Sequence, residues 1–96
     1  MRKAYIVAYD ICAPKRLRKV YKVMLGYGLR VQYSVFRCEL SRRQLAELRC
    51  RLDVLLDHHR DQILFIEFGP LGSQTDQTIT SLGRAYTPPT HDAIVL

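Results

Sequence analysis

Several features that mark other protein classes are missing from this sequence of 96 residues. Its three cysteines are odd in number, and none has the close spacing of a zinc knuckle, which argues against a disulfide framework or a structural zinc site. No apolar run approaches the roughly 18 residues of a transmembrane helix, and no signal-peptide pattern begins the sequence. We therefore expect one cytoplasmic domain with reduced thiols and no membrane association.

Acidic residues are also scarce, with nine Asp and Glu against fifteen Lys and Arg, for a formal net charge of +6. Such an excess in a small domain points to a polyanionic partner, with RNA or double-stranded DNA the first candidates. The alternative is an ordinary arginine-rich surface. The positive charge is not spread evenly along the chain, however, but is concentrated in two segments. These are Arg16, Arg18, Lys19 and Lys22, and then Arg42, Arg43, Arg49 and Arg51.

Strand and helix patterns alternate along the chain. Residues 5–11 are apolar on both faces and predict a central strand, and Pro14 then opens a helix with one apolar stripe that stops at Gly26 and Gly28. Residues 29–40 have the propensity of one long strand, because no turn dipeptide interrupts them. A capping-box pattern at residues 41–44 begins a second amphipathic helix, expected to reach about His59. Further strands are predicted at residues 63–68 and 78–82, and a loop at residues 72–76.

These elements predict an α+β fold, in which one sheet is covered on one face by two helices. Yet the strands at residues 5–11 and 63–68 are apolar on both sides, so the uncovered face would be a large exposed apolar patch. The simplest solution is a homodimer that packs sheet against sheet about a two-fold axis.

Asp10 is the first candidate for chemistry. It ends the predicted central strand and shares the side of Ile6 and Ala8, so it is expected on an otherwise apolar face, where a lone carboxylate is costly unless paired, protonated or metal-bound. One interpretation is an Asx-type cap on the turn into the first helix. The other is a metal ligand, in which two Asp10 carboxylates near a dimer axis share one Mg²⁺ or Mn²⁺ ion.

Other chemistries are less well supported. His58 and His59 are adjacent and would splay apart on a helix, so a helix-end role is favoured over a metal site with Asp57 and Asp61. Ser34 lacks the context of a serine nucleophile. An RNA-recognition motif would share the fold, but neither central strand has its basic-Gly-aromatic pattern.

The sequence resembles a known family as a set of motifs. Tyr5-Ile-Val-Ala-Tyr-Asp10-Ile, Pro14-Lys-Arg-Leu-Arg-Lys-Val20 and Arg30-Val-Gln-Tyr-Ser34-Val-Phe36 are similar, in order and spacing, to the CRISPR-associated second core protein, the small subunit that joins the CRISPR integrase in spacer acquisition. The resemblance implies a ferredoxin-like βαββαβ fold with an extra C-terminal strand. It also implies that a tight hairpin at residues 32–34 divides the long strand expected from propensity.

The same resemblance implies domain limits and residue roles. Residues 1–86 form the ferredoxin-like domain, and residues 87–96 form a proline linker and a strand that adds to the partner subunit's sheet. Asp10 is implied as the catalytic, metal-binding residue. Further residues are implied near the dimer cleft (Tyr9, Arg30, Ser34 and Phe36) or at the nucleic acid (Arg16, Arg18 and Lys19). Arg37 departs from the family pattern, which commonly has an acidic residue there.

Two functional hypotheses remain at this stage. The first is a magnesium-dependent endonuclease of RNA or double-stranded DNA, with Asp10 holding the ion. The second is a non-catalytic dimeric scaffold, whose basic side chains hold a duplex while the CRISPR integrase performs the chemistry. A toxin ribonuclease of similar fold is a third and weaker interpretation.

Overall fold

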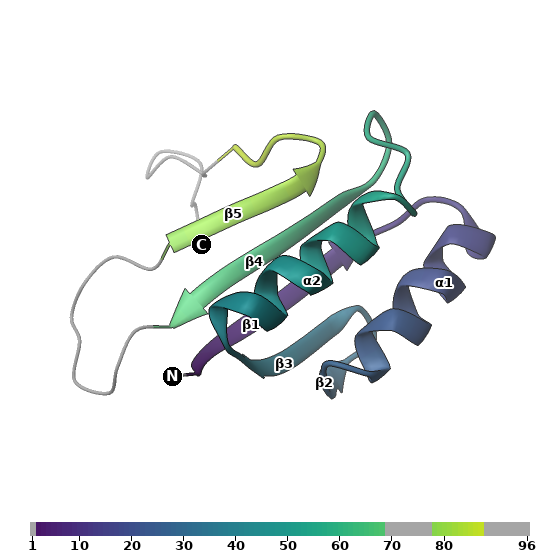
Figure 1. Ribbon diagram of the computed structural model, residues 1–96. Coiled ribbons are helices and arrows are strands. Elements are labelled where there is room, and N and C mark those ends of the chain that lie inside the picture. Colours follow the sequence, from purple (N-terminus) through teal and green to yellow (C-terminus); the bar gives the residue numbers. More distant parts are fainter. Residues whose placement is uncertain (1, 69–77, 88–96) are drawn as a thin grey trace, which may run out of the picture.

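The computed structural model describes residues 2–68 and 78–87 as seven elements (Figure 1). Their order alternates strands and helices as the sequence predicted. The bounds are β1 (Lys3–Asp10), α1 (Pro14–Leu25), β2 (Gly28–Gln32), β3 (Val35–Leu40), α2 (Arg42–Asp53), β4 (Gln62–Phe68) and β5 (Thr78–Gly83).

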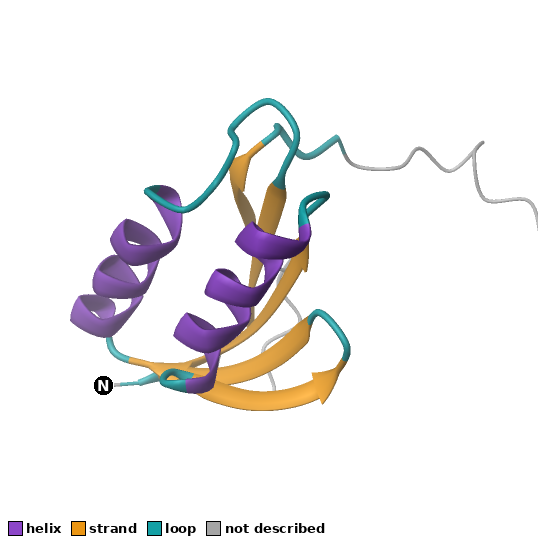
Figure 2. Cartoon of the chain, turned by 90° about the vertical axis from the view of Figure 1, so that its right-hand side faces the viewer, coloured by secondary structure: helices purple, strands orange, loops and turns teal. Residues whose placement is uncertain are grey.

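The five strands form one antiparallel sheet in the order β2-β3-β1-β4-β5, with β1 at its centre. Val7 lies opposite Phe36 of β3 and Phe65 of β4, which fixes the register of the three inner strands. Both helices lie on the same side of the curved sheet (Figure 2). The α+β, ferredoxin-like fold predicted from the sequence is therefore confirmed, and β5 corresponds to the strand expected at residues 78–82.

The core lies between the helices and the sheet. Tyr5, Val7 and Tyr9 alternate toward the helices because successive side chains of a strand point to opposite faces. Residues of the two predicted helical stripes meet them and are fully buried: Val20 and Met24 from α1, and Leu48 and Leu52 from α2.

The chain between α1 and β3 differs from the expectation of one long strand. A turn at Tyr33 and Ser34 separates β2 from β3, as the family resemblance implied. Gly28 is also part of β2 rather than a helix stop. A Cβ at Gly28 would lie 2.5 Å from Cys38 Sγ, so this strand position requires glycine for close approach.

Helix α2 begins where predicted but ends earlier. Ser41 Oγ accepts a hydrogen bond from the Gln44 backbone N–H at 3.1 Å, and Gln44 Oε1 accepts one from the Ser41 N–H at 2.9 Å, which completes the capping box. The expectation of a helix to His59 was wrong, because α2 ends at Asp53. Turns follow instead, and the Asp57 carboxylate accepts hydrogen bonds from the backbone N–H groups of His59 and Arg60.

The sheet face opposite the helices is apolar at its centre. Ile6 and Ala8 of β1 lie beside Leu64 and Ile66 of β4, and all four are only half-buried. No described element covers them, in agreement with the prediction that both faces of these strands are apolar.

Two further expectations fall outside the part of the chain that the structure describes. These are the loop at residues 72–76 and the terminal strand near residues 92–96, so the division at residue 86 stays a prediction. Among the described residues, no helix is long and apolar enough to cross a membrane.

Candidate functional site

A groove of about 540 Å³ lies at the end of β1, between α1 and the β2–β3 hairpin. It brings together residues from three separate motifs of the sequence. Five predicted site residues line it, namely Tyr9, Asp10, Arg18, Arg30 and Ser34. The remaining lining residues are Ile11, Leu17, Tyr21 and Tyr33.

Asp10 is exposed at this groove rather than enclosed by an apolar face. Its side chain is 78% exposed because β1 ends there, beyond the apolar centre of the sheet and opposite Gln62 of β4. The interpretation as a helix cap is wrong, since the α1 N-cap is Ala13 and no side chain caps it. Asp10 Oδ2 instead accepts a hydrogen bond at 3.0 Å from Nη2 of Arg84.

Arg84 was not singled out from the sequence, and the backbone explains how it reaches Asp10. It follows Gly83, whose φ of 82° is the left-handed conformation that favours glycine. The Arg84 backbone N–H donates to the Asp61 carbonyl at 2.8 Å, and its Nε donates to the Arg60 carbonyl at 3.0 Å. The guanidinium is thus oriented before it meets the Asp10 carboxylate.

Asp61 is the one buried charged residue among those described, with no exposed surface. Its carboxylate accepts from Arg16 Nε at 2.7 Å and Nη2 at 3.2 Å, and from the backbone N–H groups of Cys12 and Asp57. Burial acts to raise the pKa of Asp61, but these hydrogen bonds outweigh it and hold the pKa well below its usual range. Asp61 therefore ties the start of α1 to the loop before β4.

This arrangement separates the predicted basic residues of α1. Arg16 is committed to Asp61, and that hydrogen bond raises the pKa of its guanidinium further. Arg18 lines the groove, and Lys19 is exposed on the next position of the helix.

The described residues contain no group of three His, Cys, Asp or Glu side chains able to hold a metal ion, and this applies also to the residues around His58.

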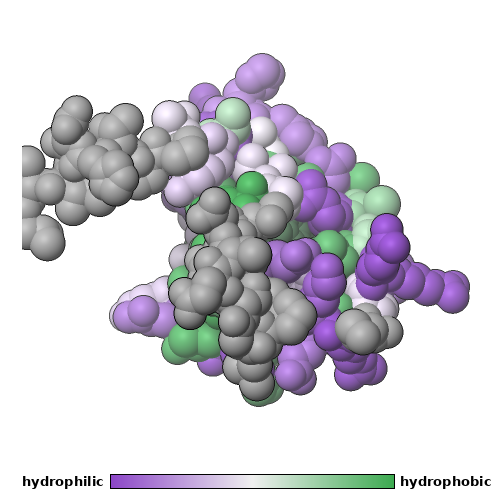
Figure 3. Space-filling model, turned by 90° about the vertical axis from the view of Figure 1, so that its left-hand side faces the viewer, coloured by the Kyte–Doolittle hydropathy of each residue, from purple (hydrophilic) through white to green (hydrophobic). Residues whose placement is uncertain are grey.

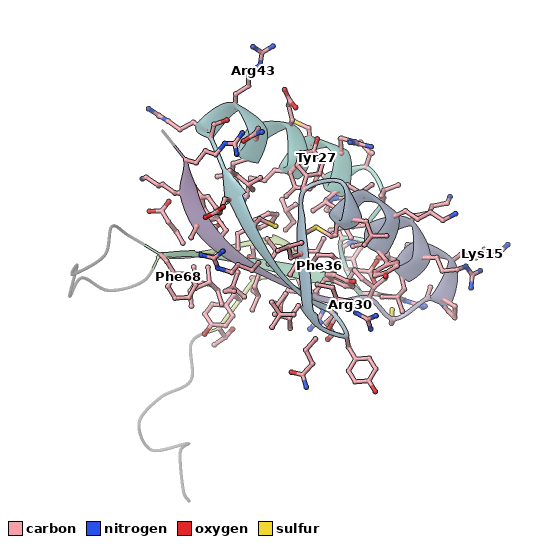
Figure 4. All side chains as sticks on the ribbon, turned by 90° about the horizontal axis from the view of Figure 1, so that it is seen from below. Lys15, Tyr27, Arg30, Phe36, Arg43 and Phe68 are labelled. Atoms are coloured by element: carbon pink, nitrogen blue, oxygen red, sulfur yellow. The ribbon has the colours of Figure 1, made fainter. Side chains whose placement is uncertain are left out.

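Three tyrosines line the groove, and the buried Phe36 packs behind two of them. Phe36 is fully buried, stacks on Tyr9 with ring centroids 6.2 Å apart, and meets the edge of Tyr21 at 6.0 Å. Burial raises the pKa of Tyr9, so its hydroxyl stays protonated. The Arg30 guanidinium lies over the rings of Tyr21 and Tyr33, at 5.6 and 5.8 Å. Figure 4 shows Arg30 and Phe36 near the same hairpin.

The second basic segment lies on α2, away from the groove. Arg42 and Arg43 are exposed, whereas Arg49 lies 4.9 Å from the Phe65 ring and donates to Thr80 Oγ1 at 2.9 Å. In Figure 3 hydrophilic side chains lie around most of the visible face, with smaller apolar groups between them. Arg37, the departure from the family pattern, pairs with Glu39 at 3.8 Å on the apolar sheet face.

The fold and groove define a class of protein, a basic ferredoxin-like α+β domain with one exposed carboxylate at the end of its central strand. The family model for the CRISPR associated protein Cas2 matches residues 3–78. The chain therefore belongs to the Cas2 family, as the motif resemblance indicated.

Individual relatives agree with that membership. The chain is 40% identical to a Rhodospirillum rubrum protein named CRISPR-associated endoribonuclease Cas2 1, over 97% of this chain and 90% of the relative. It is 30% identical to CRISPR-associated endoribonuclease Cas2 of Geobacter sulfurreducens, over the full length of both. Among solved structures, hypothetical protein TT1823 of Thermus thermophilus has a TM-score of 0.70 and 34% identity, over 81% of this chain and 96% of that one.

Proposed function

We propose that this chain is a metal-dependent endonuclease of CRISPR spacer acquisition, which binds RNA or double-stranded DNA as a cytoplasmic homodimer. The observation that carries the proposal is the position of Asp10. An exposed carboxylate stands at the mouth of a groove that also holds Arg18 and Arg30, so a cation and a phosphate can meet there. Two relatives are named endoribonucleases, which supports the same chemistry.

The donor set decides what kind of metal site fits. One carboxylate is too few for a closed protein cage, but Mg²⁺ commonly keeps several waters and takes one or two carboxylates plus substrate phosphate oxygens. Asp10 suits that role because, among the described residues, only one of its two oxygens has a protein donor, Arg84. A second Asp10 from a partner chain would supply the other carboxylate. When bound, the ion would polarise the phosphodiester and favour ionisation of a bound water.

The uncovered sheet face supports the proposed homodimer. Ile6, Leu64 and Ile66 form an apolar centre that is only half-buried in one chain. Packing that face against a second copy would remove the apolar area from water, and it would stabilise a domain whose own core is small. Asp10 ends β1 on the side of Ile6 and Ala8, so a two-fold axis that passes near this end of the face would bring two Asp10 residues toward each other.

The basic side chains divide into two roles in this proposal. Arg18 and Lys19 are exposed and have no acidic partner among the described residues, so they can meet phosphates, and Arg30 lines the groove beside Arg18. Arg16, which the family motif also places at the nucleic acid, is held by Asp61 and would act chiefly by fixing the start of α1. The CRISPR integrase subunit is the proposed protein partner.

A scaffold without catalysis is the second candidate, and one observation favours it. Asp10 already has a cationic partner in Arg84, so its charge needs no metal to be compensated. In that case the dimer would hold a duplex through its basic side chains, and Asp10 would serve only to anchor Arg84 at the end of β5.

Cleavage assays with matched variants separate the two candidates. Labelled RNA and duplex DNA are incubated with the wild-type chain and with Asp10→Asn, in Mg²⁺ and in EDTA. Asp53→Asn is the control, because that carboxylate is also exposed and, within the part of the chain that the structure describes, it bonds His58 alone. The nuclease proposal expects metal-dependent cleavage that Asp10→Asn abolishes and Asp53→Asn retains. Equal products from all three proteins, with duplex binding intact, would favour the scaffold.

A further inference from the structure

The groove beside Asp10 is larger and more apolar than phosphate binding alone requires. Its volume of about 540 Å³ lies within the usual range for small-molecule sites, and its walls carry Leu17, Tyr21 and Tyr33 in addition to the charged residues. A phosphate group is compact and fully hydrophilic, so it gains no binding energy from contact with these apolar walls. The groove therefore has room, and apolar contact surface, for more of a ligand than its phosphate.

Two of the wall residues are exposed although they are large and apolar. Tyr33, at the tip of the β2–β3 hairpin, is 80% exposed, and Leu17 of α1 is 38% exposed. Neither side chain is required by the core in that position. They face the groove from two different elements, which is the arrangement expected of a binding surface.

The hairpin wall is also held in place. The Arg30 guanidinium lies over both Tyr21 and Tyr33, and Arg30 Nε donates a hydrogen bond to the Tyr33 carbonyl at 3.3 Å. Below it, the Tyr9 backbone N–H donates to the Ser34 carbonyl at 3.0 Å. These contacts fix the turn and orient a planar, cationic and aromatic surface before any ligand arrives.

A planar heterocycle with polar edges matches this surface. Nucleobases stack on tyrosine rings and on guanidinium planes, and the phosphate attached to such a base would extend toward Asp10 and Arg18. We propose that Leu17, Tyr21, Arg30 and Tyr33 form a subsite for one unpaired nucleobase. The inference rests on the proposed function, because it assigns the substrate of the same groove.

The subsite has a consequence for substrate choice. A base in a duplex is stacked and paired, so it cannot enter the groove unless it is first extruded, which costs unpairing energy. The strand acted upon is therefore single-stranded, or locally unpaired, at the nucleotide beside Asp10. Double-stranded DNA would be held by the outer basic side chains but would not fill the groove.

The chain offers a matched control on another side of the molecule. Tyr27 has an arginine over its ring as well, since Arg51 lies at 5.5 Å, and it lines a separate groove of about 540 Å³. That groove is formed with α2 rather than with Asp10. Figure 4 shows Tyr27 apart from Arg30. Substitution of Tyr27 therefore removes the same chemical pair without touching the proposed subsite.

The test measures base stacking in the absence of cleavage. Single strands with one 2-aminopurine, as RNA and as DNA, are titrated in EDTA with Asp10→Asn protein, and fluorescence quenching and affinity are recorded. We expect quenching of both strands, because stacking needs no 2′-hydroxyl. Adding Tyr33→Ala should abolish quenching and weaken binding roughly tenfold. Tyr33→Trp should retain both, and Tyr27→Ala should change neither.

Specific outcomes would overturn the subsite. These are undiminished quenching with Tyr33→Ala, equal losses with Tyr27→Ala, or quenching of RNA alone. Tyr33 is exposed, so circular dichroism should show an unchanged fold in the variant. Failure of the nuclease proposal would be separate, because it would appear as cleavage that is absent or insensitive to Asp10→Asn while the stacking signal persists.

Discussion

Replacing Asp61 by asparagine tests the structural centre of this end of the molecule. The carboxylate is fully buried and accepts hydrogen bonds from five donor atoms of Cys12, Arg16 and Asp57. Asparagine keeps one acceptor oxygen but presents an NH₂ group where the other oxygen stood, opposite donors. The Asp57 backbone N–H, 2.9 Å from Asp61 Oδ2, would lose its partner.

The expected loss follows from the backbone donors alone. A buried donor without a partner costs about 1–3 kcal/mol, and the remaining bonds weaken when the acceptor loses its charge, so we expect destabilisation by about 2–4 kcal/mol. Arg16 is partly exposed, and we assign no energy to its attraction. In urea, with a slope of about 1 kcal/mol/M, the unfolding midpoint should fall by about 2 M or more.

The pH dependence provides a second check with a definite sign. The pKa of Asp61 is lowered in the folded chain, so its stabilising effect is complete above the unfolded value of about 4 and is lost as the pH falls toward the folded value. The stability gap between wild type and Asp61→Asn should therefore shrink below about pH 4. Asp53→Asn, at an exposed carboxylate, should change the midpoint little. A loss under about 1 kcal/mol, or a gap unchanged at pH 3, would refute the reasoning.

Two further predictions concern the last residue of β5 and the residue that follows it. Gly83→Ala should destabilise the chain by more than about 1 kcal/mol in urea unfolding, because φ is 82° and a Cβ would collide with the Asp61 carbonyl. Gly26→Ala, at a φ of −81°, should change stability by less than about 0.5 kcal/mol, and equal effects would contradict this. Arg84→Gln should tighten Mn²⁺ binding at Asp10 about two- to fivefold in electron paramagnetic resonance titrations, since an exposed competing cation is removed. Weaker or equal binding would show that Arg84 does not compete.

Local patterns were sufficient to predict most of the fold. The stripe that includes Val20 and Met24 identified α1, and the Ser41–Gln44 capping box identified the start of α2, because both signals involve residues within about two turns of each other. The doubly apolar character of β1 likewise predicted its central position.

The β2–β3 hairpin could not be predicted from local patterns. No turn dipeptide marks residues 33–34, and propensity alone favours one strand through them. The turn is instead held by contacts that local propensity does not encode, including the hydrogen bond from the Tyr9 N–H to the Ser34 carbonyl. The register of the β2–β3 pair is also irregular between Arg30 and Gln32, just before the turn. Family motifs predicted it because they carry information about such tertiary contacts.

The pairs that organise the site could not be predicted, because they join residues distant in sequence. Arg16 and Asp61 are 45 positions apart, and Asp10 and Arg84 are 74 apart. The periodicity of helices and strands contains no information about partners at such separations. In the sequence, Asp61 stands out only as a neighbour of two histidines, and no pattern marks Arg84.

The two carboxylates at this end of the sheet differ in burial and in hydrogen bonding, and the difference identifies the candidate for chemistry. Asp61 is fully buried, and both of its oxygens are occupied by donors of the protein, so it has nothing left to offer a ligand. Asp10 is 78% exposed and its Oδ1 has no protein donor within the described residues. A cation or a hydrated phosphate can therefore bind at Asp10 without leaving a buried donor unpaired, whereas at Asp61 it would have to displace Arg16. Among the described residues that line the groove, Asp10 is thus the one carboxylate open to a ligand, while Asp61 supplies the rigidity that keeps α1 beside it.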